Sequence, residues 1–143
     1  MCWDRIKKIF NKKQHVIENG RRVLAIDDDA GQCVMIQKTL ENQGYRVLLA
    51  EDGAKGLETA FKERPDVILL DVLMPGMRGD EVCRKLKSDD RTKDIPVLFL
   101  TSLNDPKDVI THYDLGAEIH LTKPINPKEL ISQIEITLKS KSS

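Results

Sequence analysis

Five residues with charged or hydroxyl side chains stand within two positions of the end of a short, mainly apolar run in this 143-residue chain. They are Asp27, Asp28, Asp71, Thr101 and Lys123. An apolar run of four or five residues is typical of a strand buried on both faces. Open α/β sheets bind their ligands at the carboxyl ends of such strands. We therefore expect these five side chains to meet at one edge of a sheet.

Three of the five are carboxylates, and a cluster of carboxylates indicates a cation. Two carboxylates about 4 Å apart repel each other by about 4 kcal/mol at an effective dielectric constant of about 20. A hard divalent ion that takes oxygen ligands and keeps part of its water shell would relieve this repulsion, and Mg²⁺ fits that description best. The plain alternative is that Asp27 and Asp28 only terminate a strand.

From residue 21 onward the chain alternates between strand-like and helix-like segments. The expected strands are residues 22–26, 46–50, 67–70, 97–100 and 117–121. A helix is expected after each strand: a stretch ending at Gly44, then residues 53–64, 79–88, 105–116 and a last helix from Pro127. Strands that alternate with helices form a parallel sheet covered on both faces. Five strands favour the flavodoxin-like (βα)5 doubly wound α/β fold with strand order 2-1-3-4-5.

The composition favours one domain, residues 21–140, in a reducing compartment. The chain has 23 basic and 23 acidic residues and 4% aromatic residues, so neither charge nor a stacking surface indicates a nucleic-acid partner. Cys2, Cys33 and Cys83 are scattered and lack metal-ligand spacing, which favours a cytoplasmic location over a disulfide framework. No apolar run approaches the roughly 20 residues of a membrane span, and no signal peptide is visible.

Residues 1–20 form a separate basic amphipathic extension. On a helical wheel its apolar residues share one face, which contains Cys2, Trp3, Ile6, Ile9, Phe10, Val16 and Ile17. Lys13 falls within that face, so an ideal helix should end near Asn11, and so short a helix is marginally stable alone. Three roles stay open: a tail or a segment docked on its own domain, a contact with a partner or second copy, and a membrane contact. We favour the first.

Four short motifs now identify a family resemblance. They are IDDD around Asp28, LLDVLMPGM around Asp71, FLTS ending at Ser102, and LTKPI around Lys123. The acidic pair, the acceptor, the hydroxyl and the lysine are separated by 43, 30 and 22 residues. Over residues 21–140 the chain resembles a response regulator receiver domain of two-component signalling, of the single-domain type.

This resemblance implies a phosphorylation site. Asp71 would be the phosphoacceptor, whose carboxylate attacks the phosphorus of a phosphohistidine and forms an acyl phosphate. Asp28, Asp71 and the backbone carbonyl of Leu73 would bind Mg²⁺, with Asp27 acting directly or through water. Lys123 would join the metal in neutralising charge on the phosphoryl oxygens.

The resemblance also implies a switch that carries the signal to the surface. Thr101 would hydrogen-bond the phosphoryl group and move towards it, and Lys123-Pro124 would be a cis peptide. In the family an aromatic residue three positions before the lysine swings inward with the threonine, whereas this chain has His120 there. His120 could serve as a smaller, titratable switch ring, or it could be an ordinary histidine at a strand end.

Two further features concern the output surface and the phosphoryl lifetime. Ile119 stands where the family is often acidic. It lies next to the helix 4–strand 5–helix 5 face, formed by the expected segments 105–116, 117–121 and the last helix from Pro127, where we expect a downstream target or a second copy to bind. Leu73 and Leu103 follow Asp71 and Thr101 by two residues and flank the route of an attacking water. We hypothesise that these leucines slow the loss of the phosphoryl group.

Three functions are compatible with these residues. The first is a phosphoacceptor signalling protein that receives a phosphoryl group from a histidine kinase or a histidine phosphotransfer protein and signals by protein contact. It would assist its own phosphotransfer and dephosphorylation without being a turnover enzyme. The second is an unphosphorylated pseudo-receiver used for scaffolding, against which the retained Asp71, Thr101 and Lys123 argue. The third is an enzyme on the same fold, for which no glycine-rich phosphate loop is visible.

Overall fold

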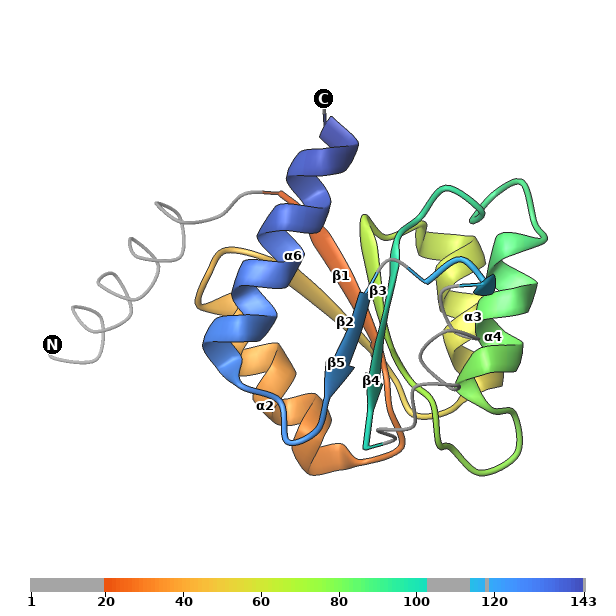
Figure 1. Ribbon diagram of the computed structural model, residues 1–143, viewed down its shortest axis with the longest axis horizontal. Coiled ribbons are helices and arrows are strands. Elements are labelled where there is room, and N and C mark those ends of the chain that lie inside the picture. The colour runs from red at the N-terminus through yellow and green to blue at the C-terminus, as the bar shows by residue number, and fades with distance from the viewer. Residues whose placement is uncertain (1–19, 103–113, 118, 143) are drawn as a thin grey trace, which may run out of the picture.

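The computed structural model describes residues 20–102, 114–117 and 119–142, and these residues form a three-layered α/β domain (Figure 1). Five parallel strands form one sheet in the order β2-β1-β3-β4-β5. The strands are β1 (Arg22–Ile26), β2 (Arg46–Ala50), β3 (Val67–Asp71), β4 (Val97–Thr101) and β5 (Ile119–Thr122). The described helices are α2 (Ala30–Glu41), α3 (Gly53–Glu63), α4 (Gly79–Lys87) and α6 (Pro127–Ser142). The fold class and strand order expected from the sequence are confirmed.

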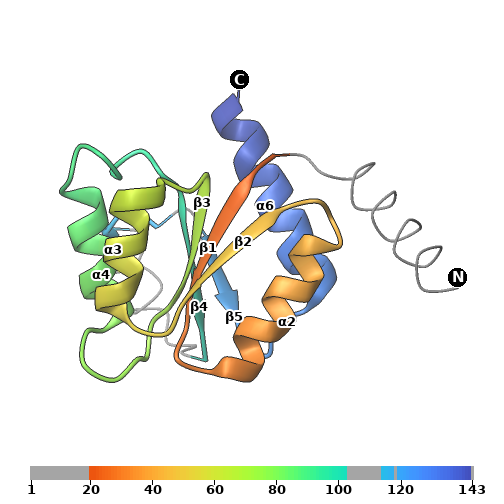
Figure 2. The ribbon, with the colours of Figure 1, turned by 180° about the vertical axis from the view of Figure 1, so that it is seen from behind.

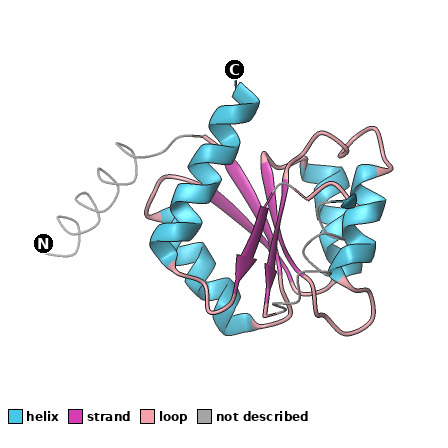
Figure 3. Ribbon diagram, viewed as in Figure 1, coloured by secondary structure: helices cyan, strands magenta, loops and turns pink. Residues whose placement is uncertain are grey.

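The helices cover both faces of the sheet. α2 and α6 lie on one face, and α3 and α4 lie on the other (Figures 1, 2 and 3). Every residue of β3 and β4 is buried, because these central strands have helices on both sides. Alternate strand residues belong to separate core clusters: Leu24 and Ile68 pack on the α3–α4 side, whereas Val23 and Val67 pack on the α2–α6 side.

The strand register places the expected functional residues at one edge. Ile26 is paired with Leu70, so Asp27 and Asp71 directly follow a matched pair. Asp71 is in turn paired with Leu100, the residue before Thr101. Because all five strands run in the same direction, their carboxyl ends meet there.

Side-chain caps make two helices begin close to that same edge. The Asp29 side chain accepts a hydrogen bond from the Gln32 amide (3.1 Å) at the start of α2. Asp52 accepts one from the Lys55 amide (2.8 Å) at the start of α3. Aspartate is a favoured N-cap because its oxygen satisfies an amide that has no partner within the helix. These caps therefore determine where each helix leaves the functional edge.

The structure corrects several expected boundaries. The first helix ends at Glu41 rather than continuing to Gly44, and Gly44 adopts a φ of 90° in the turn that follows. The last strand begins at Ile119 rather than at residue 117, because the left-handed Gly116 (φ 96°) turns the chain just before it. The strand endings at Asp71 and Thr101 are each one residue later than expected. The expected helix at 105–116 and the extension at 1–20 fall almost entirely outside the described residues.

Two other expectations concern the thiols and the membrane. Cys33 and Cys83 are free and buried, and Cys2 lies outside the described residues. Among the helices of residues 20–102, 114–117 and 119–142, none combines the length and apolar character that a bilayer crossing requires.

Candidate functional site

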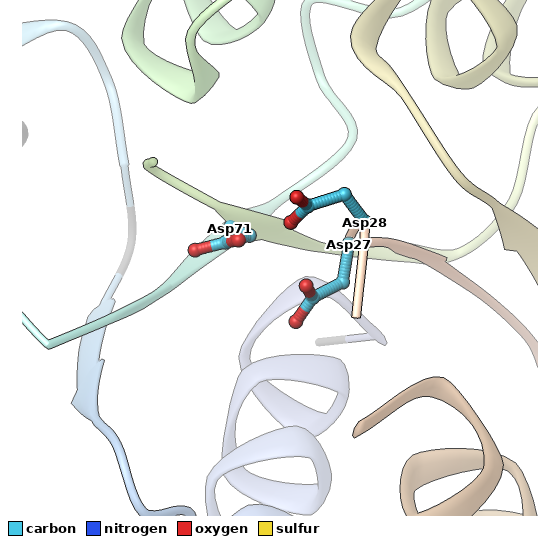
Figure 4. A group of neighbouring side chains, drawn as sticks. All are labelled: Asp27, Asp28 and Asp71. Atoms are coloured by element: carbon cyan, nitrogen blue, oxygen red, sulfur yellow. The ribbon is translucent and has the colours of Figure 1, made fainter. Parts of the chain in front are cut away.

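Three carboxylates form the centre of the site at the carboxyl edge of the sheet. One oxygen from each of Asp27, Asp28 and Asp71 lies within 4.8 Å of the other two. Figure 4 shows the three side chains grouped where β1 and β3 end. Asp27 and Asp71 are buried, with exposed fractions of 1% and 4%, whereas Asp28 is exposed. The cluster is therefore open to solvent mainly on the Asp28 side.

The backbone around Asp27 holds its carboxylate in place. The Asp27 amide donates to the Ala50 carbonyl (3.1 Å), which ties the end of β1 to β2. The Asp27 Oδ1 atom accepts a hydrogen bond from the Asp29 amide (3.0 Å), and the Cys33 thiol donates to the Asp27 carbonyl (3.3 Å). These contacts leave Oδ2 to face the interior of the site.

Lys123 directly follows β5 and joins the acidic cluster at the same carboxyl edge of the sheet. Its Nζ atom lies 2.9 Å from Asp27 Oδ2 and 3.5 Å from Asp71 Oδ1. The Lys123 amide donates to the Thr101 carbonyl (2.8 Å), and the Lys123-Pro124 peptide bond is cis. The family resemblance implied this cis bond, and the structure has it.

The electrostatics of the cluster are those of a site with excess negative charge. Burial, followed by the charge of the neighbouring Asp27 carboxylate, raises the pKa of Asp71 from 3.8 to about 6, although the charge of Lys123 acts to lower it. Burial alone would lower the pKa of Lys123, but its hydrogen bond to Asp27 and the charges of Asp27 and Asp71 outweigh that effect and raise it. Lys123 therefore stays charged, yet one amine does not balance three carboxylates.

The donor set fits Mg²⁺. All three side chains offer carboxylate oxygens, which are the hard ligands that this ion prefers. Exposure of Asp28 leaves room for the water ligands that Mg²⁺ retains. The raised pKa of Asp71 also shows that a further positive charge would stabilise the ionised cluster.

The remaining expected site residues differ in how far their side chains are exposed to solvent. Thr101 is fully buried at the end of β4. Leu73, in the loop after Asp71, is 43% exposed. His120 is half-buried, pairs with Phe99 in the sheet register, and has its Nε2 atom shielded from solvent. Leu103 lies outside the described residues.

Gly79 is a site residue that sequence reasoning used only as the start of a helix. A Cβ atom at this position would lie 2.2 Å from the Asp71 carbonyl oxygen and 2.8 Å from the Val72 Cα atom. The Gly79 amide donates to the Val72 carbonyl (2.9 Å), so the loop after Asp71 returns directly onto its own strand. A glycine at the first position of a helix that closes the acceptor loop was the available signal, because close backbone approach requires glycine.

The comparisons with known proteins agree with this geometry. The family model described as the response regulator receiver domain matches residues 23–135. The chain belongs to the response regulator receiver family. Receiver domains are the phosphorylation-dependent signalling modules of two-component systems. The resemblance to a receiver domain is confirmed, whereas the single-domain type stays an expectation.

Relatives and solved structures of this receiver family cover most of the chain. It is 42% identical over 118 residues to the DNA-binding dual master transcriptional regulator RpaA of a Synechocystis species, covering 82% of this chain and 49% of RpaA. It is 37% identical over 120 residues to the phosphate regulon transcriptional regulatory protein PhoB of Pseudomonas aeruginosa, covering 84% and 52%. The chemotaxis protein CheY4 of Vibrio cholerae has a TM-score of 0.79 and 36% identity, covering 82% of this chain and 98% of CheY4.

The chain spans about half the length of the curated relatives it matches. Several of those relatives, RpaA among them, are DNA-binding regulators by name. The expected absence of a nucleic-acid partner for this receiver domain therefore stays an expectation.

Proposed function

We propose that this receiver domain accepts a phosphoryl group on Asp71 from a histidine kinase or a histidine phosphotransfer protein. The observation that supports this best is the placement of Asp71, buried to 96% within reach of Lys123 (3.5 Å) and grouped with Asp27 and Asp28. A buried carboxylate with an amine on one side and two carboxylates on the other is suited to receive an anion together with a cation. Aspartates that only terminate strands would not need to be clustered around a buried carboxylate and an amine.

The transfer forms one bond and breaks one. A carboxylate oxygen of Asp71 attacks phosphorus, the P–N bond of the phosphohistidine breaks, and the ring nitrogen keeps the electron pair and takes up a proton. Asp71 must be ionised to attack, and a pKa of about 6 leaves most of it ionised near neutral pH. Lys123 neutralises charge on the phosphoryl oxygens, and Asp27 holds that amine in position (2.9 Å).

The metal and the hydroxyl complete the proposed site. Asp28, Asp71 and the Leu73 carbonyl would hold Mg²⁺, with Asp27 acting directly or through water. When bound, this ion supplies positive charge to the transferred group. Thr101, at the end of β4, would donate a hydrogen bond from its hydroxyl to the phosphoryl group. Its movement towards that group would couple phosphorylation to the edge of the sheet.

We place the output on the surface of β5 and α6; the helix expected at 105–116, which is the third part of the proposed output face, lies almost entirely outside the described residues. Ile136 of α6 is 54% exposed, and Ile119 of β5 is half-buried against the core rather than forming a surface patch. An exposed isoleucine on a helix is weak support for contact with a target or second copy. His120, which has Phe99 as its register partner, is the proposed switch ring that links Thr101 to this surface.

Acetyl phosphate and Mg²⁺ test the proposal directly. Intact-mass measurement should show a gain of one phosphoryl group that is absent in Asp71→Asn and present in the control Asp94→Asn, which removes an exposed carboxylate outside the site. No gain in the wild-type chain would favour a scaffolding pseudo-receiver. Turnover of a small phosphoester without a stable adduct would favour an enzyme.

A further inference from the structure

A groove of about 650 Å³ lies along the open edge of the sheet, on the side of β2. β2 is an edge strand, with α2 against one face of the sheet and α3 against the other (Figure 2). Val34 of α2 and Leu49 of β2 line the groove. The groove extends to Asp27 and Asp28 at one end and to Glu63 at the other.

The groove contains an exposed apolar patch. Val34 is 45% exposed and Leu49 is 40% exposed. Within the described part of the chain, the large apolar side chains with this degree of exposure are Val34, Leu49, Leu73 and Ile136, so half of them border one groove. Clustered apolar exposure rimmed by charged residues marks a binding surface more often than scattered exposure does.

The rim of the groove is acidic. It carries the carboxylates of Asp28, Glu51, Glu58 and Glu63 against two lysines, one of which, Lys55, is paired with Glu51. The chain as a whole has equal numbers of acidic and basic residues. Residues 1–19 contain five basic and two acidic residues, so the rest of the chain is acidic by the same margin. An occupant with an apolar face and a basic face would complement this groove, and residues 2–11 have both.

The amino-terminal segment also enters the domain beside the groove. Arg22 Nη1 lies 3.5 Å from Glu63 Oε2. The first residue of β1 therefore contacts a residue that lines one end of the groove. A helix rises about 1.5 Å per residue and a strand about 3.3 Å, so ten helical residues match the five-residue β2 at roughly 15 Å. Residues 12–19 are long enough to connect such a helix to β1.

We propose that residues 2–11 of this chain dock intramolecularly in the β2 groove, with their apolar face against Val34 and Leu49 and their basic residues towards its acidic rim. The docked segment would border Asp27 and Asp28. If the proposed phosphorylation of Asp71 holds, docking would also restrict a bulky phosphodonor more than acetyl phosphate. The docking itself does not depend on that function.

Trp3 makes the proposal testable in the full chain, because it is the sole tryptophan and lies in the segment. We expect its emission to be blue-shifted and its quenching by acrylamide to be several-fold weaker than in the urea-unfolded chain, independent of protein concentration. Leu49→Lys should restore quenching close to the unfolded value. The matched control Ile136→Lys, at an exposed site on α6 outside the groove, should leave it unchanged.

A second pair of variants tests the charge complementarity without altering an apolar residue. Because the docking is partly electrostatic, quenching of Trp3 in the wild-type chain should increase with salt. Glu58→Lys, on the exposed face of α3, should increase quenching and abolish this dependence on salt, whereas Glu135→Lys on α6 should do neither. Circular dichroism would verify that each variant is folded.

Four results would each overturn the proposal: quenching at the unfolded value in wild type, no response to Leu49→Lys, protection that appears only at high protein concentration, and protection that requires phosphatidylserine vesicles. The third would indicate a second copy, and the fourth a membrane. Each readout is independent of phosphorylation, so failure here leaves the proposed function intact.

Discussion

Asp71 holds a negative charge in surroundings that oppose it. Its side chain is buried beside Asp27, and the amine of Lys123 at 3.5 Å offsets only part of this repulsion. A carboxylate whose pKa is raised on folding binds a proton more tightly in the native state than in the unfolded state. The stability of the folded protein therefore depends on pH, on Lys123 and on any cation that occupies the site.

The first prediction concerns the pH dependence of stability without metal. The pKa of Asp71 rises from 3.8 to about 6 on folding, so stability should be lost as pH rises from about 4 through about 6. Asp71→Asn removes this charge and should be more stable than wild type by about 1–3 kcal/mol at neutral pH in EDTA. The difference should shrink near pH 4.

Urea unfolding at the two pH values measures this effect. Asp94→Asn, an exposed carboxylate outside the site, should follow wild type at both values. Identical pH dependence of wild type and Asp71→Asn would show that Asp71 is not destabilised in the folded state.

The second prediction concerns the close approach at Gly79. Gly79→Ala would force a Cβ atom against the Asp71 carbonyl oxygen, where 2.2 Å is available, so the acceptor loop must move. We expect a loss of about 3 kcal/mol, the upper end for overpacked sites, together with slower phosphoryl uptake. Gly31→Ala in the exposed first turn of α2 should change stability by less than about 1 kcal/mol. Equal denaturation midpoints for the two variants would contradict the steric argument.

At the scale of elements, the strands supply position and the loops supply access. β3 and β4 are buried throughout, so their ends are held rigidly by core packing on both faces. The loop after β3 is different, because Leu73 is 43% exposed while the adjacent Val72 and Met74 are buried. Leu73 is thus a large apolar side chain held next to the site by its neighbours.

The third prediction tests whether this loop controls water. Leu73→Asn should speed hydrolysis of the acyl phosphate several-fold, because a polar side chain can orient a water molecule that leucine excludes. The decay of phosphorylated protein, followed by intact mass after removal of the donor, measures the rate. Ile136→Asn, which changes an exposed apolar residue on α6, is the matched control. Indistinguishable decay of Leu73→Asn and wild type would rule out a role for Leu73 in water exclusion.

At the scale of the whole molecule, the parallel sheet brings distant segments to one edge. Asp27 and Lys123 are 96 residues apart in sequence, yet their side chains are 2.9 Å apart. A cation bound by this edge would contact residues from β1 and β3 together, so its binding should stabilise the complete domain rather than one element.

The fourth prediction concerns that stabilisation. At about 100 times its dissociation constant, Mg²⁺ should raise the free energy of unfolding by about 2.7 kcal/mol. Asp28→Asn should remove most of this gain, because it deletes the exposed oxygen ligand, while Asp94→Asn should retain it. Thermal unfolding with Mg²⁺ and with EDTA gives the comparison. A gain in Asp28→Asn equal to that of wild type would place the ion elsewhere.

Most of the architecture could be predicted from the sequence because its signals are local. Apolar runs between turn residues are visible at the strands, and the Asp-rich, Thr and Lys endings are visible where those runs stop. Boundaries shifted by one to three residues, and the larger shifts lie beside the left-handed glycines Gly44 and Gly116, since turn geometry is decided by the backbone on both sides. Gly79 was missed in its main role, because nothing local shows that the Asp71 carbonyl lies 2.2 Å from its missing Cβ.

The amino-acid sequence by itself determined the chemistry of this receiver domain: three carboxylates, a hydroxyl and an amine at the ends of apolar segments. Only the tertiary structure decided that Lys123 Nζ contacts both Asp27 and Asp71, that Asp28 alone of the three acids faces solvent, and that an acidic groove runs along β2. The reason is physical. Side-chain type and strand propensity are properties of neighbouring residues, whereas distances, burial and grooves arise when segments far apart in the chain pack together.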